Sequence, residues 1–100
     1  MRPSCRPSRR IVPLVHRAAQ VSLARLLLSH GRPAEALAAF DAYLDGGAGT
    51  LAAEARYGRI RALRALHRPD DERRAIESFL EAHGESVYAP KLRDRLESLG

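Results

Sequence analysis

One stretch of this chain returns after 36 residues. Arg32–Leu44, which reads RPAEALAAFDAYL, aligns without a gap on Arg68–Leu80, which reads RPDDERRAIESFL. The aligned apolar pairs are Ala39 with Ala75, Phe40 with Ile76, Tyr43 with Phe79 and Leu44 with Leu80. The same offset continues outside the motif, where Ile60 pairs with Leu96 and Leu63 with Leu99. A fixed period of this length is typical of stacked helical repeats, so we expect Ala39 and Ala75 to occupy equivalent buried positions between helices.

The composition favours helices over strands. Of the 100 residues, 45% are hydrophobic, and these are mostly Ala and Leu, with two Phe, three Tyr and no Trp. Ala and Leu are the strongest helix formers, and the β-branched residues typical of strands are few. The length fits one domain that can bury a modest core. We therefore predict a single all-α domain.

Apolar spacings of three and four residues, interrupted at Gly and Pro, predict five antiparallel helices. They cover residues 14–30, 33 to 43 or 45, 50–67 and 69–82, and a last helix begins at residue 86 or 89 and carries Leu99. Gly31 lies where a helix end favours positive φ, and Pro33 and Pro69 suit the first turn of the next helix. Thr50 is the predicted N-cap of the third helix. The last helix has one apolar stripe and a charged back, which is typical of the cap of a stacked array.

The N-terminal third of the chain holds the positive charge. Residues 1–34 contain seven Arg and no acid, whereas residues 35–100 contain ten Lys plus Arg against twelve acids. Residues 1–12, rich in Arg, Pro and Ser, are predicted to form a disordered basic tail, and residues 13–100 the helical domain. The tail lacks the uninterrupted apolar core of a secretory signal. A transit peptide, and a start site inside a longer gene, are two further interpretations.

The sequence contains no pattern that indicates catalysis, a metal or a cofactor. The four histidines are His16, His30, His67 and His83, and no two of them have metal-ligand spacing. The last three fall at predicted helix ends, where a cation complements the helix dipole, and the acids at residues 70–72 stand at a helix start for the same reason. A single cysteine, Cys5, excludes an intrachain disulfide, and no apolar run is long enough for a membrane span. We therefore expect a non-enzymatic protein.

Helix–turn–helix units of this length resemble the tetratricopeptide repeat, whose usual period is 34 residues and whose pattern is W-x2-L-G-x2-Y, then A-x3-F, then P. Ala36-x3-Phe40 matches the second part, Leu23-Ala24-x2-Leu27 approximates the first, and Gly31 stands at the turn glycine. The departures are Gln20 and Arg56 for Trp, Ile60 for the packing Gly, Glu72 for the small Ala, and Ala48 or Gly84 for Pro. The resemblance implies a right-handed array of two units plus a C-terminal cap helix.

The 36-residue spacing and the segment Leu51–Pro90 are more similar to one bacterial subgroup. These are the envelope modules of the periplasmic coordinator of cell division and of the lipoprotein in the outer-membrane barrel assembly machine. The resemblance covers residues 17–100. The sequence as it stands predicts a cytoplasmic protein, and a periplasmic one if it is the tail of a longer envelope protein.

In this repeat class the first helix of each unit faces an inner groove, where a peptide or a helix of a protein partner binds. The groove residues that the resemblance implies are Val21, Arg25, Leu28, Tyr57, Arg61, Arg64 and Arg93. Arg suits an acidic segment or a C-terminal carboxylate, because its planar fork grips carboxylates at two points. The alternative for Tyr57, Arg61 and Arg64 is a solvated Arg-rich face. An alternative function is nucleic-acid binding through the Arg-rich N-terminus, which the near-neutral helical part disfavours.

Overall fold

The computed structural model describes residues 13–47 and 49–99, with side chains from residue 17 onward. It contains five helices: α2 (Pro13–Ser29), α3 (Pro33–Asp45), α4 (Ala52–Ala65), α5 (Pro69–Ala82) and α6 (Ala89–Leu99). The predicted all-α fold is therefore confirmed. The predicted bounds of α3 and α5, and the predicted end of α2, lie within two residues of the observed ones. The predicted tail, residues 1–12, lies outside the described residues.

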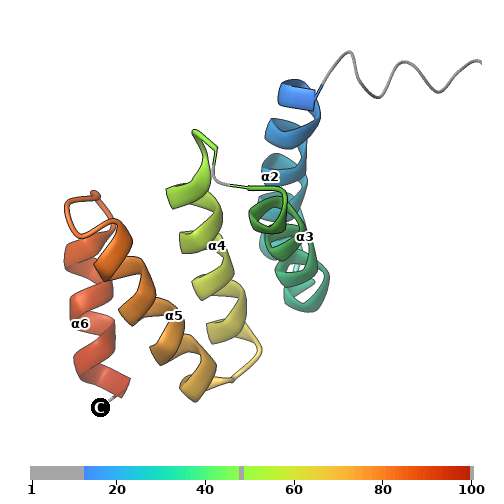
Figure 1. Ribbon diagram of the computed structural model, residues 1–100. Helices are drawn as coiled ribbons and strands as arrows, with labels where there is room; N and C mark the ends of the chain where they lie inside the picture. The colour runs from blue at the N-terminus through green and yellow to red at the C-terminus, as the bar shows by residue number, and fades with distance from the viewer. Residues whose placement is uncertain (1–12, 48, 100) are drawn as a thin grey trace, which may run out of the picture.

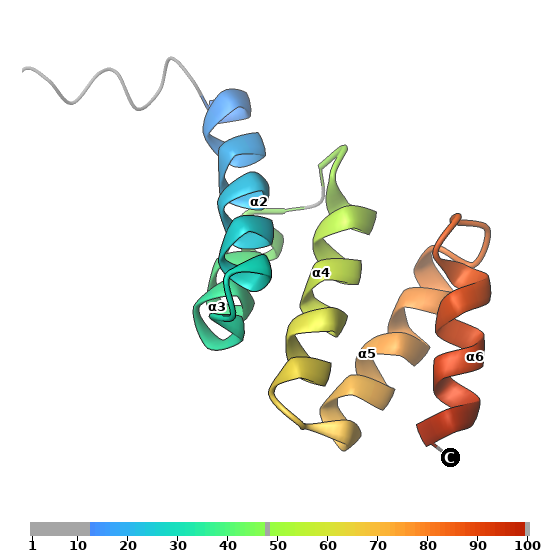
Figure 2. The same ribbon diagram turned by 180° about the vertical axis from the view of Figure 1, so that it is seen from behind.

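The helices form a row in which each one runs opposite to the one before it (Figures 1 and 2). Each helix packs on the next along the chain, and α2 also touches α4. Helices α2 and α3 form the first unit and α4 and α5 the second, while α6 closes the row. As a result α2, α4 and α6 run in the same direction. Each described helix is too short or too polar to cross a membrane.

The two units end and restart at matching positions. Helices α2 and α4 end at Ser29 and Ala65, and α3 and α5 begin at Pro33 and Pro69, in both cases 36 residues apart. Proline suits the first turn of a helix because its missing N–H is not needed there. The period read from the sequence is thus the period of the structure.

The turn between the two helices of a unit is also built twice. Gly31 has a φ of 75° and His67, at the same repeat position, a φ of 58°. The closing hydrogen bonds run from the amide of Arg32 to the carbonyl of Leu27 over 2.9 Å and from the amide of Arg68 to that of Leu63 over 3.1 Å. This closure needs one residue with left-handed backbone dihedral angles. That conformation costs glycine nothing, and it costs a residue with a Cβ about 1–2 kcal/mol. His67 therefore holds a glycine conformation that the repeat imposes.

The prediction that Thr50 caps α4 was wrong. The helix begins at Ala52, its N-cap is Leu51, and no side chain caps it. The connection is held by other groups, because the amide of Leu51 donates to the Tyr43 hydroxyl over 3.3 Å and the amide of Ala52 donates to the carbonyl of Gly49 over 3.1 Å. Thr50 is left exposed to solvent.

Arg17 of α2 ties this connection to the first unit. Its guanidinium donates to the carbonyl of Tyr43 over 2.9 Å and to that of Gly47, and it lies 4.3 Å from the centre of the Tyr43 ring. A guanidinium over an aromatic ring is a favourable cation–π contact. The sequence analysis did not single out Arg17, because its partners are carbonyls that only the fold brings near.

The first core cluster joins α2, α3 and α4. Its fully buried members are Val21, Ala24, Ala36, Phe40, Tyr43 and Ala55. Gly58 of α4 lies against the Phe40 ring so closely that an added Cβ would be 2.5 Å from Cε1 and 2.7 Å from Cε2. Glycine is thus required there by a close approach between two helices, and this contact sets the distance between α3 and α4.

The second core cluster joins α4, α5 and α6 around Ile60, Ile76, Phe79 and Leu92. Ala39 and Ala75 occupy equivalent positions beside the two clusters, but both are only half-buried, so the prediction that they are buried was wrong. Fully buried positions of the second helices lie three residues earlier, at Ala36 of α3 and Glu72 of α5.

Candidate protein-interaction surface

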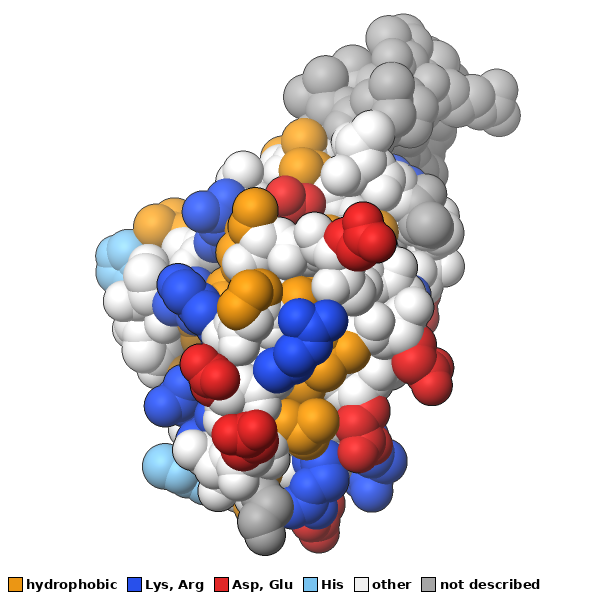
Figure 3. Space-filling model, turned by 90° about the vertical axis from the view of Figure 1, so that its left-hand side faces the viewer, with side chains coloured by type: hydrophobic (Ala, Val, Ile, Leu, Met, Phe, Trp, Pro, Cys, Tyr) orange, Lys and Arg blue, Asp and Glu red, His pale blue; other side chains and the backbone are white. Residues whose placement is uncertain are grey.

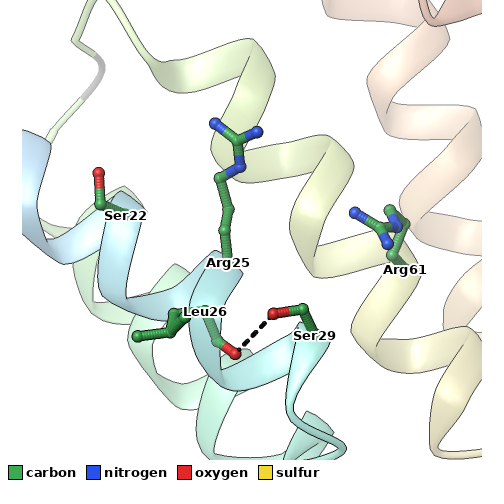
Figure 4. Close-up of a pocket in the computed structure, with 5 residues that line it drawn as sticks. All are labelled: Ser22, Arg25, Leu26, Ser29 and Arg61. Carbon is green, nitrogen blue, oxygen red and sulfur yellow. Dashed lines mark hydrogen bonds between the residues drawn. The ribbon is translucent and has the colours of Figure 1, made fainter.

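A basic face runs across the first helices of the units. Arg25 of α2 and Arg61 of α4 border a hollow of about 390 Å3, together with Ser22, Leu26 and Ser29. Figure 4 shows the two guanidinium groups on neighbouring helices at this hollow, and the Ser29 hydroxyl donating to the carbonyl of Leu26 over 3.0 Å. Because Arg25 and Arg61 are 36 residues apart, the repeat places them at the same angle on parallel helices.

A second, smaller hollow of about 110 Å3 lies between α4, α5 and α6. Its lining residues are Tyr57, Ile60, Arg61, Arg64, Glu72, Lys91, Leu92 and Arg95. Arg61 lines both hollows, so they adjoin across α4. We call the exposed cations of the two hollows, Arg25, Arg61, Arg64 and Lys91, the basic face.

The basic face carries uncompensated charge. Within residues 17–47 and 49–99, no carboxylate lies within ion-pair distance of any of its four cations. Its neighbour Arg95 is different, because Glu72 neutralises it through two bonds, Nε to Oε2 over 2.7 Å and Nη2 to Oε1 over 3.0 Å. Hydrogen bonding to this carboxylate, which is only 1% exposed, raises the pKa of Arg95.

The predicted groove residues are only partly brought together. Arg25, Arg61 and Arg64 border the hollows, and Tyr57 lines the smaller one while its ring stacks on Tyr88 with centroids 4.0 Å apart. Arg93 instead donates to the carbonyl of Gly84 over 3.2 Å and lines neither hollow.

The two aliphatic groove residues pack inward instead. Leu28 is half-buried against the first core cluster. Val21 is 2% exposed inside that cluster, so its assignment to the groove was wrong. The physical reason is packing and not helix periodicity. Val21 and Arg25 are four residues apart on the same side of α2, but Val21 is enclosed by the first core cluster and Arg25 is exposed.

The structure adds two residues that the sequence analysis missed. Lys91 joins the basic face, and its signal was the charged back of the last helix, which was interpreted only as a solvated cap. Arg95 joins the smaller hollow, and its signal was Glu72, an acid at a position where the repeat pattern has a small Ala.

His30 and Asp71, outside this face, contact groups in or next to their own helices. Nδ1 of His30 donates to the carbonyl of Leu26 over 2.8 Å, which confirms its place at a helix end. Asp71 accepts hydrogen bonds from Arg68 and Arg74, which lower the pKa of its carboxyl group. Across the described residues, no three His, Cys, Asp or Glu side chains gather as a metal site would require.

Fold and face together define a class of protein: a short row of antiparallel helical hairpins with an open basic face across their first helices. A family model of the tetratricopeptide repeat matches residues 10–50 and residues 21–87. The chain therefore belongs to the tetratricopeptide repeat family, as its resemblance implied. Neither the curated proteins nor the solved structures contain a match. Repeats of this family generally mediate protein–protein interaction and typically act as non-catalytic scaffolds.

Proposed function

We propose that this protein binds an acidic peptide segment of a protein partner along the basic face. The observation that carries the proposal is the set of exposed arginines, Arg25, Arg61 and Arg64, which border adjoining hollows and have no acidic partner in the described residues. A guanidinium offers two parallel donors to one carboxylate, which gives direction as well as charge. Two such groups on parallel helices suit acids spaced along one peptide.

The smaller hollow supplies an apolar contact next to the charges. Tyr57 and Leu92 line it beside Arg61 and Arg64. The stack of Tyr57 on Tyr88 holds the phenol ring in place, so a bound side chain would lose little freedom on the protein side. A fitting ligand therefore carries acids on one side of an aliphatic or aromatic residue, or that residue followed by a free C-terminal carboxylate.

The strength of each contact depends on how much water is excluded. A hydrogen bond to a charged group contributes roughly 1.5–3 kcal/mol when shielded, and about 0.2–1 kcal/mol on an open rim. Because both hollows are open to solvent, we expect micromolar affinity from several contacts together, on the order of −8 kcal/mol.

The test is binding of a fluorescein-labelled peptide of ten residues that alternates Asp or Glu with Leu or Phe, followed by anisotropy. Arg61→Glu combined with Arg64→Glu should abolish binding while the helical circular dichroism signal is kept. The matched control is Arg32→Glu with Arg74→Glu, which makes the same charge change at exposed sites in the turn before α3 and on α5 and should weaken binding far less. An amidated peptide tests the contribution of the C-terminal carboxylate.

Two results would contradict the proposal. One is equal loss of binding in the test and control variants, because only net charge would then matter. The other is binding that survives the double reversal but disappears when residues 1–12 are deleted, which would assign binding to the Arg-rich N-terminus.

A further inference from the structure

A second surface of α2, beside the basic face, has the makings of a helix-docking site. The role of this surface can be inferred from α4, which carries the equivalent positions 36 residues later. On α4 the residues Ala55, Gly58 and Ala62 are fully buried. Gly58 among them lies directly beneath the Phe40 ring of α3. This side of a first helix is therefore where the second helix of the preceding unit packs.

The positions 36 residues earlier are uncovered. Ala19, Ser22 and Leu26 correspond to Ala55, Gly58 and Ala62, and all three are exposed. Leu23, one turn before Leu26 and also on this side, corresponds to Arg59 of α4. We call Ala19, Ser22, Leu23 and Leu26 the outer face of α2.

Two large apolar side chains stand in the outer face. Leu23 and Leu26 are each 54% exposed, and among the described residues the one other large apolar side chain so exposed is Val87, in the connection before α6. Leu26 is a ridge between two hollows, the basic one already described and one of about 370 Å3 that it lines with Leu27, His30 and Arg32. A ridge of aliphatic side chains with a hollow on each side is the surface on which another helix packs.

The outer side of α6, at the opposite end of the row, is charged. Figure 3 looks at this end, and basic and acidic side chains alternate there among small apolar patches. Lys91, Arg93, Asp94 and Glu97 of α6 are all exposed. Terminal helices of stacked arrays need such a polar outer side to stay soluble. Helix α2 has the outer side of an internal helix, not of a terminal one.

The chemistry of the outer face selects its occupant. Ser22 is small and exposed, so a large side chain can pack over it. Its Cβ, which Gly58 lacks, keeps such a side chain further from the helix axis than Phe40 is at Gly58. Where Arg59 pairs with Asp41 over 2.6 Å between α3 and α4, α2 has Leu23, which calls for an apolar residue instead of the acid. Arg25, next to Leu26, offers a charge for an acid at the edge.

A second copy of this chain fits less well than a different helix. Helix α2 contains Arg17, Arg25 and no acid, so two copies facing each other would bring like charges together. The charged side of α6 likewise lacks the apolar stripe needed to cover Leu23 and Leu26.

We propose that the outer face of α2 docks an amphipathic helix of a protein partner, laid on it as α3 lies on α4. The helix presents an aromatic or large aliphatic residue above Ser22, apolar residues on either side against Leu23 and Leu26, and an acid near Arg25. The outer face adjoins the basic face, because Ser22, Leu26 and Arg25 line the first hollow together with Arg61. Leu23 lies outside both hollows, and Arg64 lies outside the outer face. The variants at Leu23 and Leu26 and those at Arg61 and Arg64 therefore test the two proposals separately.

The probe is a labelled peptide with the sequence of α3 in which Leu replaces the residue equivalent to Asp41, stapled on its polar side because an isolated helix of 13 residues is marginal in water. It is titrated against the full chain and followed by anisotropy. Leu23→Glu with Leu26→Glu should weaken binding at least tenfold. Val87→Glu, which charges the other exposed apolar side chain, should leave binding unchanged.

The controls separate docking from misfolding and from self-association. Both variants change exposed side chains, so circular dichroism and the thermal midpoint should match the unaltered chain. A probe with Ser in place of its central Phe should bind at least tenfold more weakly. No saturable binding up to millimolar probe, or equal binding by all variants, overturns the proposal. So does a dimer in sedimentation velocity that Leu23→Glu with Leu26→Glu dissociates, since a second copy would then be the occupant.

Discussion

Gly58→Ala is the sharpest test of how the two units are joined. The new Cβ would lie 2.5 Å from Cε1 of Phe40, whereas ordinary contact begins at 3.4 Å, so the ring or the helix must retreat by about 1 Å. Phe40 is fully buried and cannot turn aside into solvent. Overpacking of this kind costs roughly 1–3 kcal/mol, and Ala returns about 0.5–1 kcal/mol by stiffening the helix. The expected net loss in the free energy of unfolding is about 1–2 kcal/mol.

Urea denaturation followed by circular dichroism at 222 nm measures this loss. For a domain of this size, the same loss of stability lowers the melting temperature by roughly 5–15 °C. Gly46→Ala is the matched control, because its Cβ would meet the carbonyl of Tyr43 at 3.4 Å and its φ of −76° suits alanine. That control should change stability by less than about 0.5 kcal/mol.

A double-mutant cycle isolates the contact. In a Phe40→Leu background the ring that blocks the Cβ is gone, so Gly58→Ala should become neutral or stabilising by up to about 1 kcal/mol through helix propensity. The reasoning is refuted if Gly58→Ala has the same effect in both backgrounds, because the cost would then not come from Phe40.

Further substitutions test the left-handed turn and the Glu72–Arg95 ion pair. His67→Gly should raise the free energy of unfolding by about 1 kcal/mol, since φ is 58° there, and Gly31→Ala should lower it by a similar amount; equal thermal midpoints for His67→Gly and the unaltered chain would contradict the left-handed turn. Glu72→Ala should lower the free energy of unfolding by about 1–3 kcal/mol in urea titrations at neutral pH, because it leaves Arg95 without its buried partner. Adding Arg95→Leu should recover much of that loss. No recovery would show that the carboxylate is needed for some other contact.

The sequence by itself determined the units and where they begin and end. The period of 36, the prolines at the start of α3 and α5 and the apolar spacing are local or repeated signals, and they placed the helices and the family correctly. They also placed Arg25 and Arg61 at one angle on parallel helices, because side-chain direction along a helix follows from residue spacing alone.

Only the tertiary structure decided which residues meet across helices. Gly58 beneath Phe40, Arg95 on Glu72 and Arg17 on the Tyr43 carbonyl join residues 18 to 26 positions apart, and no local pattern marks such pairs. The same holds for burial: Val21 and Arg25 are both on α2, one turn apart, and the neighbouring helix hides the first and leaves the second in solvent. Propensity fixes a helix, but the face that it buries depends on the position and angle of the helix packed against it.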